Sequence, residues 1–489
     1  MATEPSAPAR SAQLFATFGL MMATAMQAAD STIVNVALPQ LERDLGGGVE
    51  LGAWVITSYL CATAVVAPLT GWLRRRYGAR RLFASAIVAF VSASLLCSLS
   101  TGEPGIIVAR ILQGAGAGLI LPLGQAILLD IHPKEKHGQI LAIWGAALML
   151  GPVIGPALGG IITDMASWRW VFGVNLPLGA LSIWAVWRLQ FRPQPNDDAR
   201  IDVLGILLLM TAVGSLQLCL ERGVGRSWLE SPEYASEAAI ALIAILGLSV
   251  RARRSDFSVL HPDVFRDVNF SLASFYNFMA SGLLFVVVVF IPALGEGPLG
   301  YHATLAGLTI VPRATLMLLM ILFVGRLIGR IDYRWLLASG WILMAAGLAV
   351  LASIPTTHAT SSIIVGSTIQ ALGAGMLLTP LSTLAFSTLH RDRRTDAAGL
   401  YSLVRQLGFA SGVALMTAVL RARVEVHSLF SAPIADRPGD AAAAHLANTG
   451  TLGAYRDCFL MMAIASVIIA PGILLFRIHG LGKADKKPA

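Results

Sequence analysis

Four charged side chains stand inside long apolar runs of this sequence, where a charge is costly. They are Asp30, Arg110, Arg313 and Arg405. A charge at the middle of a lipid bilayer costs about 3 kcal/mol on insertion scales, so the four together cost roughly 10 kcal/mol. A hydrated internal cavity would explain their presence. In such a cavity a lone carboxylate, here Asp30, is able to gain and lose a proton.

Asp30 is the only acidic residue within these runs, and Arg110 is placed to reach it. Asp30 lies about eight residues, or about 12 Å, from the end of its run, and Arg110 enters its own run about five residues from the same face. Burial disfavours a charged carboxylate and a nearby guanidinium favours it, so a change in either contact alters the proton affinity. The alternative is a permanent pair that only fixes helix contacts. We favour a pair that opens to exchange protons.

The runs that carry these charges are expected to be membrane-spanning helices. The 489-residue chain is 56% apolar and 13% charged, and about 20 apolar residues suffice to cross the hydrocarbon core. Strand-like alternation is absent, and helices satisfy their own backbone in lipid. We predict an all-α polytopic membrane protein with fourteen spans, near residues 14–38, 51–72, 82–101, 106–129, 139–163, 170–188, 203–220, 238–250, 268–293, 303–325, 335–354, 361–387, 397–420 and 458–476.

The net charge of +8 reflects topology. Most of the 36 Lys and Arg residues lie in every second loop and at the two ends of the chain. By the positive-inside rule that side is cytoplasmic, so we expect both termini inside a bacterial cytoplasmic (inner) membrane. Such basic loops meet anionic lipid headgroups, and no nucleic-acid partner is expected. The cysteines are scattered and lack metal-ligand spacing, so we expect no metal site. The sequence also has no phosphate-binding loop, and we expect neither a cofactor nor an enzymatic activity.

An internal echo divides the chain into halves. Gln113, Gly116 and Gly118 of the fourth span recur as Gln370, Gly373 and Gly375 of the twelfth. The spacing predicts a six-helix bundle in residues 1–192, two inserted helices in residues 193–254 and a second six-helix bundle in residues 255–489. Carriers built from parallel repeats bind substrate near the midplane, between the repeats. We predict that the substrate cavity is lined by Gln27, Asn35, Gln113, Arg313, Arg405 and Gln406.

The two arginines of the second half have two possible roles. Each could line the cavity and bind substrate anions, or donate to helix carbonyls. Pro312 leaves a carbonyl without its usual donor, which favours the structural role for Arg313, near the middle of its run. For Arg405 both roles remain open. One buried negative charge against three positive ones favours neutral, zwitterionic or weakly acidic lipophiles over dications.

The fifth span contains the string Gly151-Pro-Val-Ile-Gly-Pro-Ala-Leu-Gly-Gly160. Gly151, Gly155 and Gly159 share one helix face and permit a neighbouring helix to approach closely. Pro152 and Pro156 each remove a helical hydrogen bond and favour a kink. We predict a hinge or seal built on this string, ending at Gly160. Ordinary small-residue packing is the alternative.

Six motifs occur in order along the chain: Ala29–Pro39, Gly71–Arg81, Arg110–Gly118, Gly151–Gly160, Ser167–Pro177 and Leu403–Gly408. Together they resemble the fourteen-span drug:proton antiporter branch of the major facilitator superfamily, and the resemblance covers nearly the whole chain. It implies the major facilitator fold, a proton-coupling role for Asp30 with Arg110 as the arginine of the fourth span, and an antiporter motif at Gly151–Gly160.

The loop after the second span departs from that family. Its predicted gate residues are Gly71, Arg75, Gly78, Arg80 and Arg81. Relatives carry an acid at the place of Arg75, where it helps to latch the cytoplasmic side. Either the inner gate of this chain uses other contacts, or Arg75 only strengthens the positive-inside signal.

These features lead us to expect a proton-coupled antiporter that exports hydrophobic drugs or other lipophilic compounds by alternating access. Its partners would be the substrate, protons and the bilayer. The alternatives are a dedicated exporter of a lipid, siderophore or endogenous metabolite, an importer, and a membrane enzyme or sensor. Residues 421–457 are expected to form an external loop of no clear structure, as a candidate contact for a periplasmic membrane-fusion protein.

Overall fold

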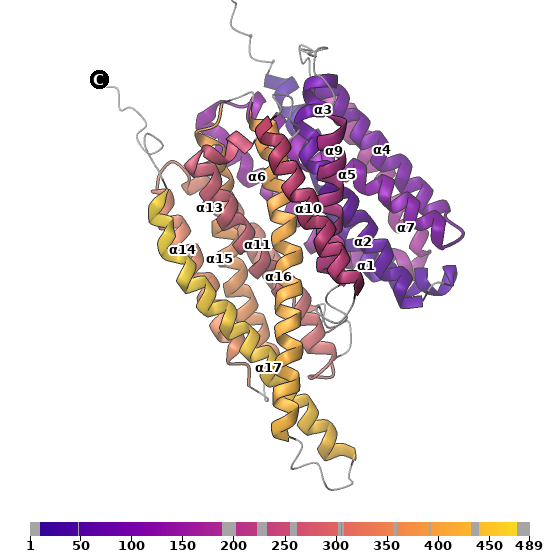
Figure 1. Cartoon of the computed structure of the whole chain (residues 1–489), viewed down its shortest axis with the longest axis vertical. Coiled ribbons are helices and arrows are strands. Elements are labelled where there is room, and N and C mark those ends of the chain that lie inside the picture. The colour runs from indigo at the N-terminus through magenta and orange to yellow at the C-terminus, as the bar shows by residue number, and fades with distance from the viewer. Residues whose placement is uncertain are drawn as a thin grey trace, which may run out of the picture. The chain divides into compact units, whose positions relative to one another are not determined.

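The computed structural model of the chain is built from helices (Figure 1). Within the described residues, the one contact of strand type is an isolated bridge between Ile328 and Ile331. The all-α class predicted from the sequence is therefore confirmed. The structure describes residues 10–46, 48–187, 202–222, 232–254, 262–301, 305, 308–355, 359–390, 393–431 and 440–476.

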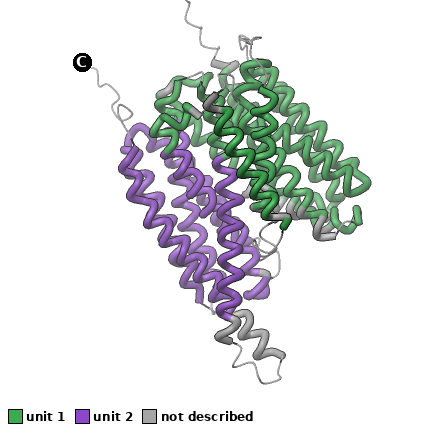
Figure 2. Tube along the Cα trace, viewed as in Figure 1, with its two compact units in different colours: residues 1–271, 386–403 green, residues 272–385, 404–489 purple. Residues whose placement is uncertain are grey.

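Unit 1 comprises residues 1–271 and 386–403 (Figure 2). Its helices follow the first eight predicted spans in order. Gly78 has a φ of 78°, a conformation that favours glycine, and it separates two of them. The helices of unit 1 are α1 (Arg10–Leu45), α2 (Gly48–Val66), η1 (Ala67–Leu69), α3 (Thr70–Tyr77), α4 (Ala79–Leu99), α5 (Glu103–Ile131), η2 (Lys134–Lys136), α6 (His137–Met165), α7 (Trp168–Gly173), α8 (Asn175–Trp187), α9 (Val203–Arg222), α10 (Pro232–Arg254) and η4 (Pro262–Arg266).

Unit 2 comprises residues 272–385 and 404–489. The long helix α16 is divided between the units, because its residues 394–403 are part of unit 1 and the rest are part of unit 2. The remaining elements are α11 (Val268–Glu296), α13 (Val311–Leu327), α14 (Tyr333–Ala352), α15 (Ala359–Ser387), α16 (Arg394–Ser431), α17 (Asp440–Ile469) and η7 (Ala470–Leu475).

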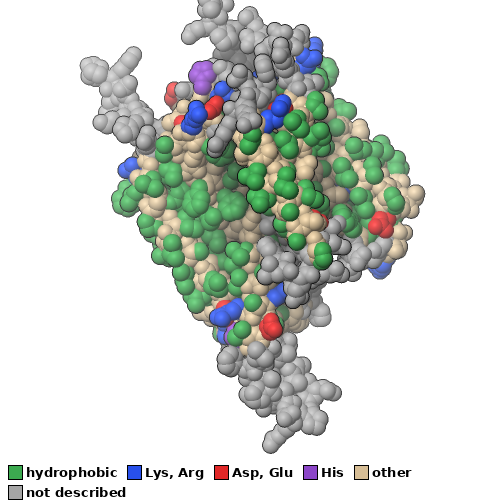
Figure 3. Space-filling view, in the orientation of Figure 1, with side chains coloured by type: hydrophobic (Ala, Val, Ile, Leu, Met, Phe, Trp, Pro, Cys, Tyr) green, Lys and Arg blue, Asp and Glu red, His purple; other side chains and the backbone are tan. Residues whose placement is uncertain are grey.

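The helices have the length and composition of membrane spans. Ten among the described residues are long and apolar enough to cross a membrane. Helices α1, α9, α10 and α13 lie at the other four predicted spans, so the fourteen-span order is compatible with the structure. Figure 3 shows apolar side chains over the flanks of the visible face and charged side chains toward the helix ends. Such wide apolar surfaces are typical of contact with lipid.

One expectation about the second half was wrong. Helix α16 continues to Ser431 and α17 begins at Asp440, so the described residues of the segment 421–457 are helical. Asp457 of α17 accepts a hydrogen bond of 2.9 Å from Arg423 of α16, an ion pair that ties the two helices together. A run of four alanines after Asp440 also favours a helix. The polar residues of the segment 421–457 had suggested a loop instead.

Arg313 lies near the start of a helix. Helix α13 begins at Val311, which places Arg313 in its first turn. Pro312 stands directly before it, where proline suits the first turn of a helix.

The internal repeat predicted from the sequence is present in the packing. A Cβ on Gly116 of α5 would lie 2.8 Å from a backbone atom of α4, and one on Gly373 of α15 would lie 2.5 Å from a backbone atom of α14. Gly118 approaches α2 in the same way, and Gly375 approaches α13. Helices α5 and α15 thus use glycines to approach equivalent pairs of neighbours.

The two helices after the first six form a hairpin of their own within unit 1. Helix α9 packs against α10 and against α2. Asp202 accepts from the backbone of Gly205, which caps α9, and also from Arg251 at the end of α10 at 2.6 Å. One carboxylate therefore starts the first helix of the pair and holds the end of the second.

Candidate functional site

The carboxylate of Asp30 lies in the interior of unit 1 and accepts three hydrogen bonds. Its side chain is fully buried. Arg110 donates to Oδ2 at 3.0 Å, and Gln113 and Asn175 donate to Oδ1 at 2.8 and 2.6 Å. Donors to both oxygens stabilise the charged form of a buried carboxylate. The sequence had placed Arg110 within reach, and the structure brings the two side chains together.

Arg110 is held by groups from three helices. Its Nε donates to the carbonyl of Val55 in α2 at 3.0 Å, and its Nη1 also donates to Gln113 Oε1 at 2.7 Å. The guanidinium lies 4.1 Å from the ring centroid of Tyr59, a cation–π contact. A buried ion pair needs such additional partners, because Coulomb attraction alone does not offset the loss of hydration.

The two amides beside Asp30 share a hydroxyl. Gln113 and Asn175 donate to Ser94 Oγ at 3.1 and 2.8 Å, and Ser94 donates to the carbonyl of Phe172 at 2.9 Å. Helix α4 thus orients donors from α5 and α8 toward a carboxylate on α1. The members of this Asp30 network, all buried, are Asp30, Ser94, Arg110, Gln113 and Asn175.

The motif that begins at Ser167 places Asn175 at the start of α8. Ser167 accepts from the backbone of the second residue of α7, which caps that helix. Trp168 Nε1 donates to Asp44 near the end of α1 at 2.9 Å. Pro177 has no N–H to donate to the last residue of α7, so the chain breaks and α8 begins at Asn175. A helix cap and a proline, both local features of the sequence, therefore place the amide of Asn175 at a helix start in the interior.

The glycine face of α6 rests on the turns of α1 that flank the carboxylate. A Cβ on Gly151 would lie 2.2 Å from the carbonyl carbon of Ala28, and one on Gly155 would lie 2.2 Å from Thr32 Oγ1. Thr32 also donates to the carbonyl of Gly151 at 3.0 Å. Gly159 approaches the carbonyl oxygen of Ile33, the next residue of α1, in the same way. The backbones of α6 and α1 are in direct contact, which a larger side chain at Gly151 would prevent.

The rest of the glycine–proline string lies in the same helix. Helix α6 runs unbroken from His137 to Met165. The side chains of Pro152 and Pro156 lie outside the described part of the structure. Gly160 is half-buried.

The predicted cavity residues belong to both units. Gln113 belongs to the Asp30 network. Gln27 is buried and donates to the hydroxyl of Tyr59 at 3.0 Å, next to that network. Arg405 is buried and Gln406 is half-buried, both in α16 within unit 2. The side chain of Asn35 lies outside the described part of the structure.

Arg313 repeats part of the Asp30 network without its acid. It donates to Gln370, the repeat counterpart of Gln113, and to the carbonyl of Leu284, both at 3.1 Å. Only 4% of its side chain is exposed. In unit 2 a backbone carbonyl therefore accepts where the carboxylate of Asp30 accepts in unit 1.

Arg75 of the predicted gate loop has an acidic partner at the start of α16. It donates to both oxygens of Asp396, at 2.8 and 2.7 Å, and the Asp396 side chain is buried. Beside it, Arg74 donates to Asp130 at 2.6 Å and to the hydroxyl of Thr395. The base thus stands where the resembled family has its acid, and α16 supplies the acid.

Further groups complete this set of charges. Arg394, with 2% of its side chain exposed, lies 3.9 Å from the carboxylate at the end of α5. Five side chains from α3, α5 and α16 form what we call the α3 cluster: Arg74, Arg75, Asp130, Arg394 and Asp396.

The other residues of the gate loop support this arrangement. A Cβ on Gly71 would lie 1.5 Å from a carboxylate oxygen of the α3 cluster, so only glycine leaves room for the ion pair. Gly78 ends α3. Arg80 donates to the carbonyl of Trp187 at the end of α8 at 2.7 Å, and Arg81 is exposed.

Comparison with known proteins decides the family. The family model described as Major Facilitator Superfamily matches residues 20–413. The chain belongs to the major facilitator superfamily. It is 34% identical over 418 residues to the multidrug export protein EmrB of Haemophilus influenzae, covering 85% of this chain and 82% of that protein. It is 31% identical over 412 residues to the fatty acid resistance protein FarB of Neisseria gonorrhoeae, covering 84% and 81%.

A solved structure of the proton:xylose symporter XylE shares the fold. Its TM-score is 0.62 at 15% sequence identity, and the match covers 95% of this chain and 96% of that chain. Together with the relatives, this confirms the major facilitator fold and the drug-exporter branch that the ordered motifs predicted. The chain is a multi-pass membrane transporter.

The sequence reasoning missed several partners of the charged residues. Asn175 lies within the motif Ser167–Pro177. An amide at the start of a helix, just after a tryptophan-rich segment, could have marked it as a partner of a buried charge. Ser94 and Tyr59 carried no signal, since apolar spans contain many hydroxyl groups. Asp396 was detectable as an acid at the start of a span, where carboxylates favour the helix dipole.

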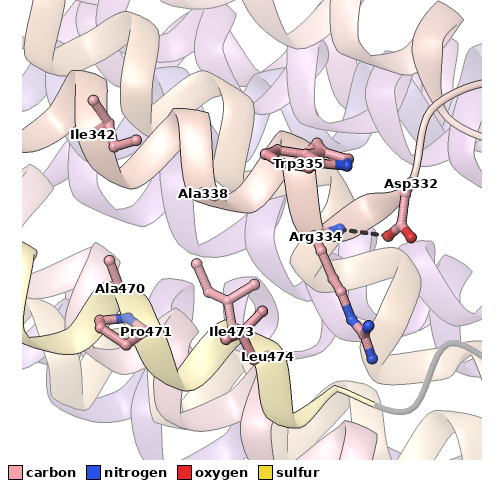
Figure 4. Close-up of a pocket in the computed structure, with 9 residues that line it drawn as sticks. All are labelled: Asp332, Arg334, Trp335, Ala338, Ile342, Ala470, Pro471, Ile473 and Leu474. Carbon is pink, nitrogen blue, oxygen red and sulfur yellow. Dashed lines mark hydrogen bonds between the residues drawn. The ribbon is translucent and has the colours of Figure 1, made fainter.

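Unit 2 of the transporter also has a surface cleft, drawn in Figure 4. The cleft has a volume of about 470 Å³ and lies between α14 and η7. Trp335, Ile342 and Leu474 form its apolar wall, and Arg334 beside Asp332 closes one end. Trp335 is 73% exposed, which suits a lipid-facing groove better than an enclosed substrate cavity.

Proposed function

We propose that the chain is a proton-coupled antiporter that exports lipophilic compounds across the inner membrane, with Asp30 as the coupling carboxylate. The observation that carries the proposal is the fully buried Asp30, ion-paired at 3.0 Å with a buried arginine. Protons entering from outside neutralise Asp30 and favour the state that releases substrate outward. Each proton contributes about 2.3 kcal/mol per 100 mV of membrane potential.

Protonation has a direct structural consequence in this proposal. Neutral Asp30 no longer balances the charge of Arg110, so the contact between α1 and α5 weakens. Helix α6 rests on the same turns of α1, through Gly151 and Gly155. Movement of these helices would alternate access to the substrate site. On the cytoplasmic side, the α3 cluster would act as the inner gate.

The test is export by inverted membrane vesicles on an imposed pH gradient. We expect Asp30→Asn to abolish uphill export while the protein remains folded, because the amide is similar in size and cannot take up the proton. An Asp30 that stays paired throughout transport would make the same hydrogen bonds as those in this structure, so the test must measure transport. Uphill export by Asp30→Asn would therefore refute the coupling role.

The same vesicles define the substrate class. One buried negative charge against three positive ones supports neutral, zwitterionic or weakly acidic lipophiles. The relative named fatty acid resistance protein supports a second candidate, a dedicated exporter of a lipid-like acid. We expect lipophilic acids to be exported and dicationic biocides to be poor substrates. Strong export of dications with none of acids would contradict this assignment.

Assembly and orientation complete the proposal. Both termini lie in the cytoplasm, as the distribution of basic residues indicates. The extended ends of α16 and α17, joined through Asp457, are the candidate contact for a periplasmic membrane-fusion protein. A helical pair offers a more rigid contact surface than the unstructured loop first expected.

A further inference from the structure

The donors around Asp30 differ in what they can do when the carboxylate takes up a proton. We propose that Asn175 follows that proton: its amide nitrogen donates to ionised Asp30, and after a half-turn its oxygen accepts the new O–H. Asn175 is thus a positioning residue for proton exchange. The inference rests on the proposed coupling role of Asp30 and deepens it.

The geometry selects Asn175 among the three donors. Arg110 carries no acceptor and so cannot receive a hydrogen bond from protonated Asp30. The oxygen of Gln113 already accepts from Arg110 at 2.7 Å, so rotation of that amide would leave two donors facing each other. The nitrogen of Asn175 donates to Asp30 and to Ser94, at 2.6 and 2.8 Å.

Ser94 is able to answer the rotation of Asn175. Its hydroxyl now donates to the carbonyl of Phe172 and accepts from both amides. A hydroxyl turns freely about its C–O bond and is both donor and acceptor. After the rotation, Ser94 could donate to the oxygen of Asn175. In exchange, the carbonyl of Phe172 gives up the Ser94 hydroxyl.

The other groups around Asp30 do not compete for this role. The charged or titratable groups that interact with it are Arg110 from α5, Tyr59 from α2 and Cys97 from α4. Tyr59 and Cys97 make no hydrogen bond to Asp30 among the described residues. Helix α6 approaches this part of α1 through the backbone of Gly151 and Gly155.

The test compares the pH dependence of export in Asn175→Leu, Asn175→Asp and Ser182→Ala. Ser182 lies on the same helix and donates to the carbonyl of Gly19 at 2.6 Å, so its variant perturbs the packing of α8 on α1 without touching Asp30. We expect Asn175→Leu to move half-maximal export to higher pH by about one unit, because hydrogen bonds to charged groups are stronger than those to neutral ones. Asn175→Asp should shift it further, and Ser182→Ala should not shift it.

Infrared difference spectra supply a second readout. The carbonyl band of protonated Asp30, identified by its loss in Asp30→Asn, should move to higher frequency in Asn175→Leu, because its O–H loses an acceptor. If wild type couples protons and Asp30→Asn does not, an unshifted pH profile and band in Asn175→Leu would overturn this inference alone. Wild type without proton-driven export would instead overturn the proposed function.

Discussion

At the scale of single residues, the guanidinium of Arg110 connects its own helix, α5, to both α1 and α2. It pairs with Asp30, donates to the carbonyl of Val55 and lies over the ring of Tyr59. Lysine could replace the charge but not the planar, multiple-donor geometry. The role of this residue thus depends on its shape as much as on its charge.

We therefore expect Arg110→Lys to lower the unfolding free energy by about 2 to 3 kcal/mol, and Arg110→Ala by about 3 to 5 kcal/mol, since the latter leaves a buried carboxylate without its counter-charge. Chemical unfolding in detergent micelles measures both. Arg169→Lys is the matched control, because Arg169 is 38% exposed and lies 3.7 Å from Asp44. Equal losses in the control and in Arg110→Lys would contradict the argument.

At the scale of elements, α16 is the helix that links the α3 cluster to the rest of the chain. Its first turn carries Asp396 within unit 1, and its later turns belong to unit 2. Any motion that carries the whole of α16 along with unit 2 must break the bond from Arg75. In the proposed mechanism, the reversed ion pair would therefore hold the inner gate closed.

A double-mutant cycle tests this pair. Arg75→Gln and Asp396→Asn should each destabilise the protein, and the double variant should be no worse than the more damaging single one. We expect a coupling of roughly 1 kcal/mol, limited by the partial exposure of Arg75. The exposed pair Arg266–Asp263, 3.0 Å apart, is the control and should show less than about 0.5 kcal/mol. Additive losses for the Arg75 pair would exclude the latch.

At the scale of the whole molecule, the distribution of basic residues sets the orientation. With fourteen predicted spans and basic loops on one side, we expect both ends of the chain to lie in the cytoplasm. A reporter enzyme that is active only in the cytoplasm should be active when fused after Ala489. The same reporter inserted between α16 and α17 should be silent. The reverse pattern would overturn the topology and, with it, the direction of export.

The sequence by itself determined the helices, their order and the rare charges within them. Apolar length and the cost of a buried charge are local properties, so Asp30 and Arg110 were identifiable before any contact was known. The glycine face of α6 could also be predicted from the sequence, because the spacing of its glycines follows the helical repeat.

Only the tertiary structure decided which groups meet. Asn175 reaches Asp30 across 145 residues of sequence, and Asp396 reaches Arg75 across 321. Partners at such separations depend on how several helices pack, and one amide or acid among many carries no local mark of its partner. The ends of α16 and α17 were mispredicted because hydropathy locates the bilayer, whereas helix propensity and ion pairs determine where a helix stops.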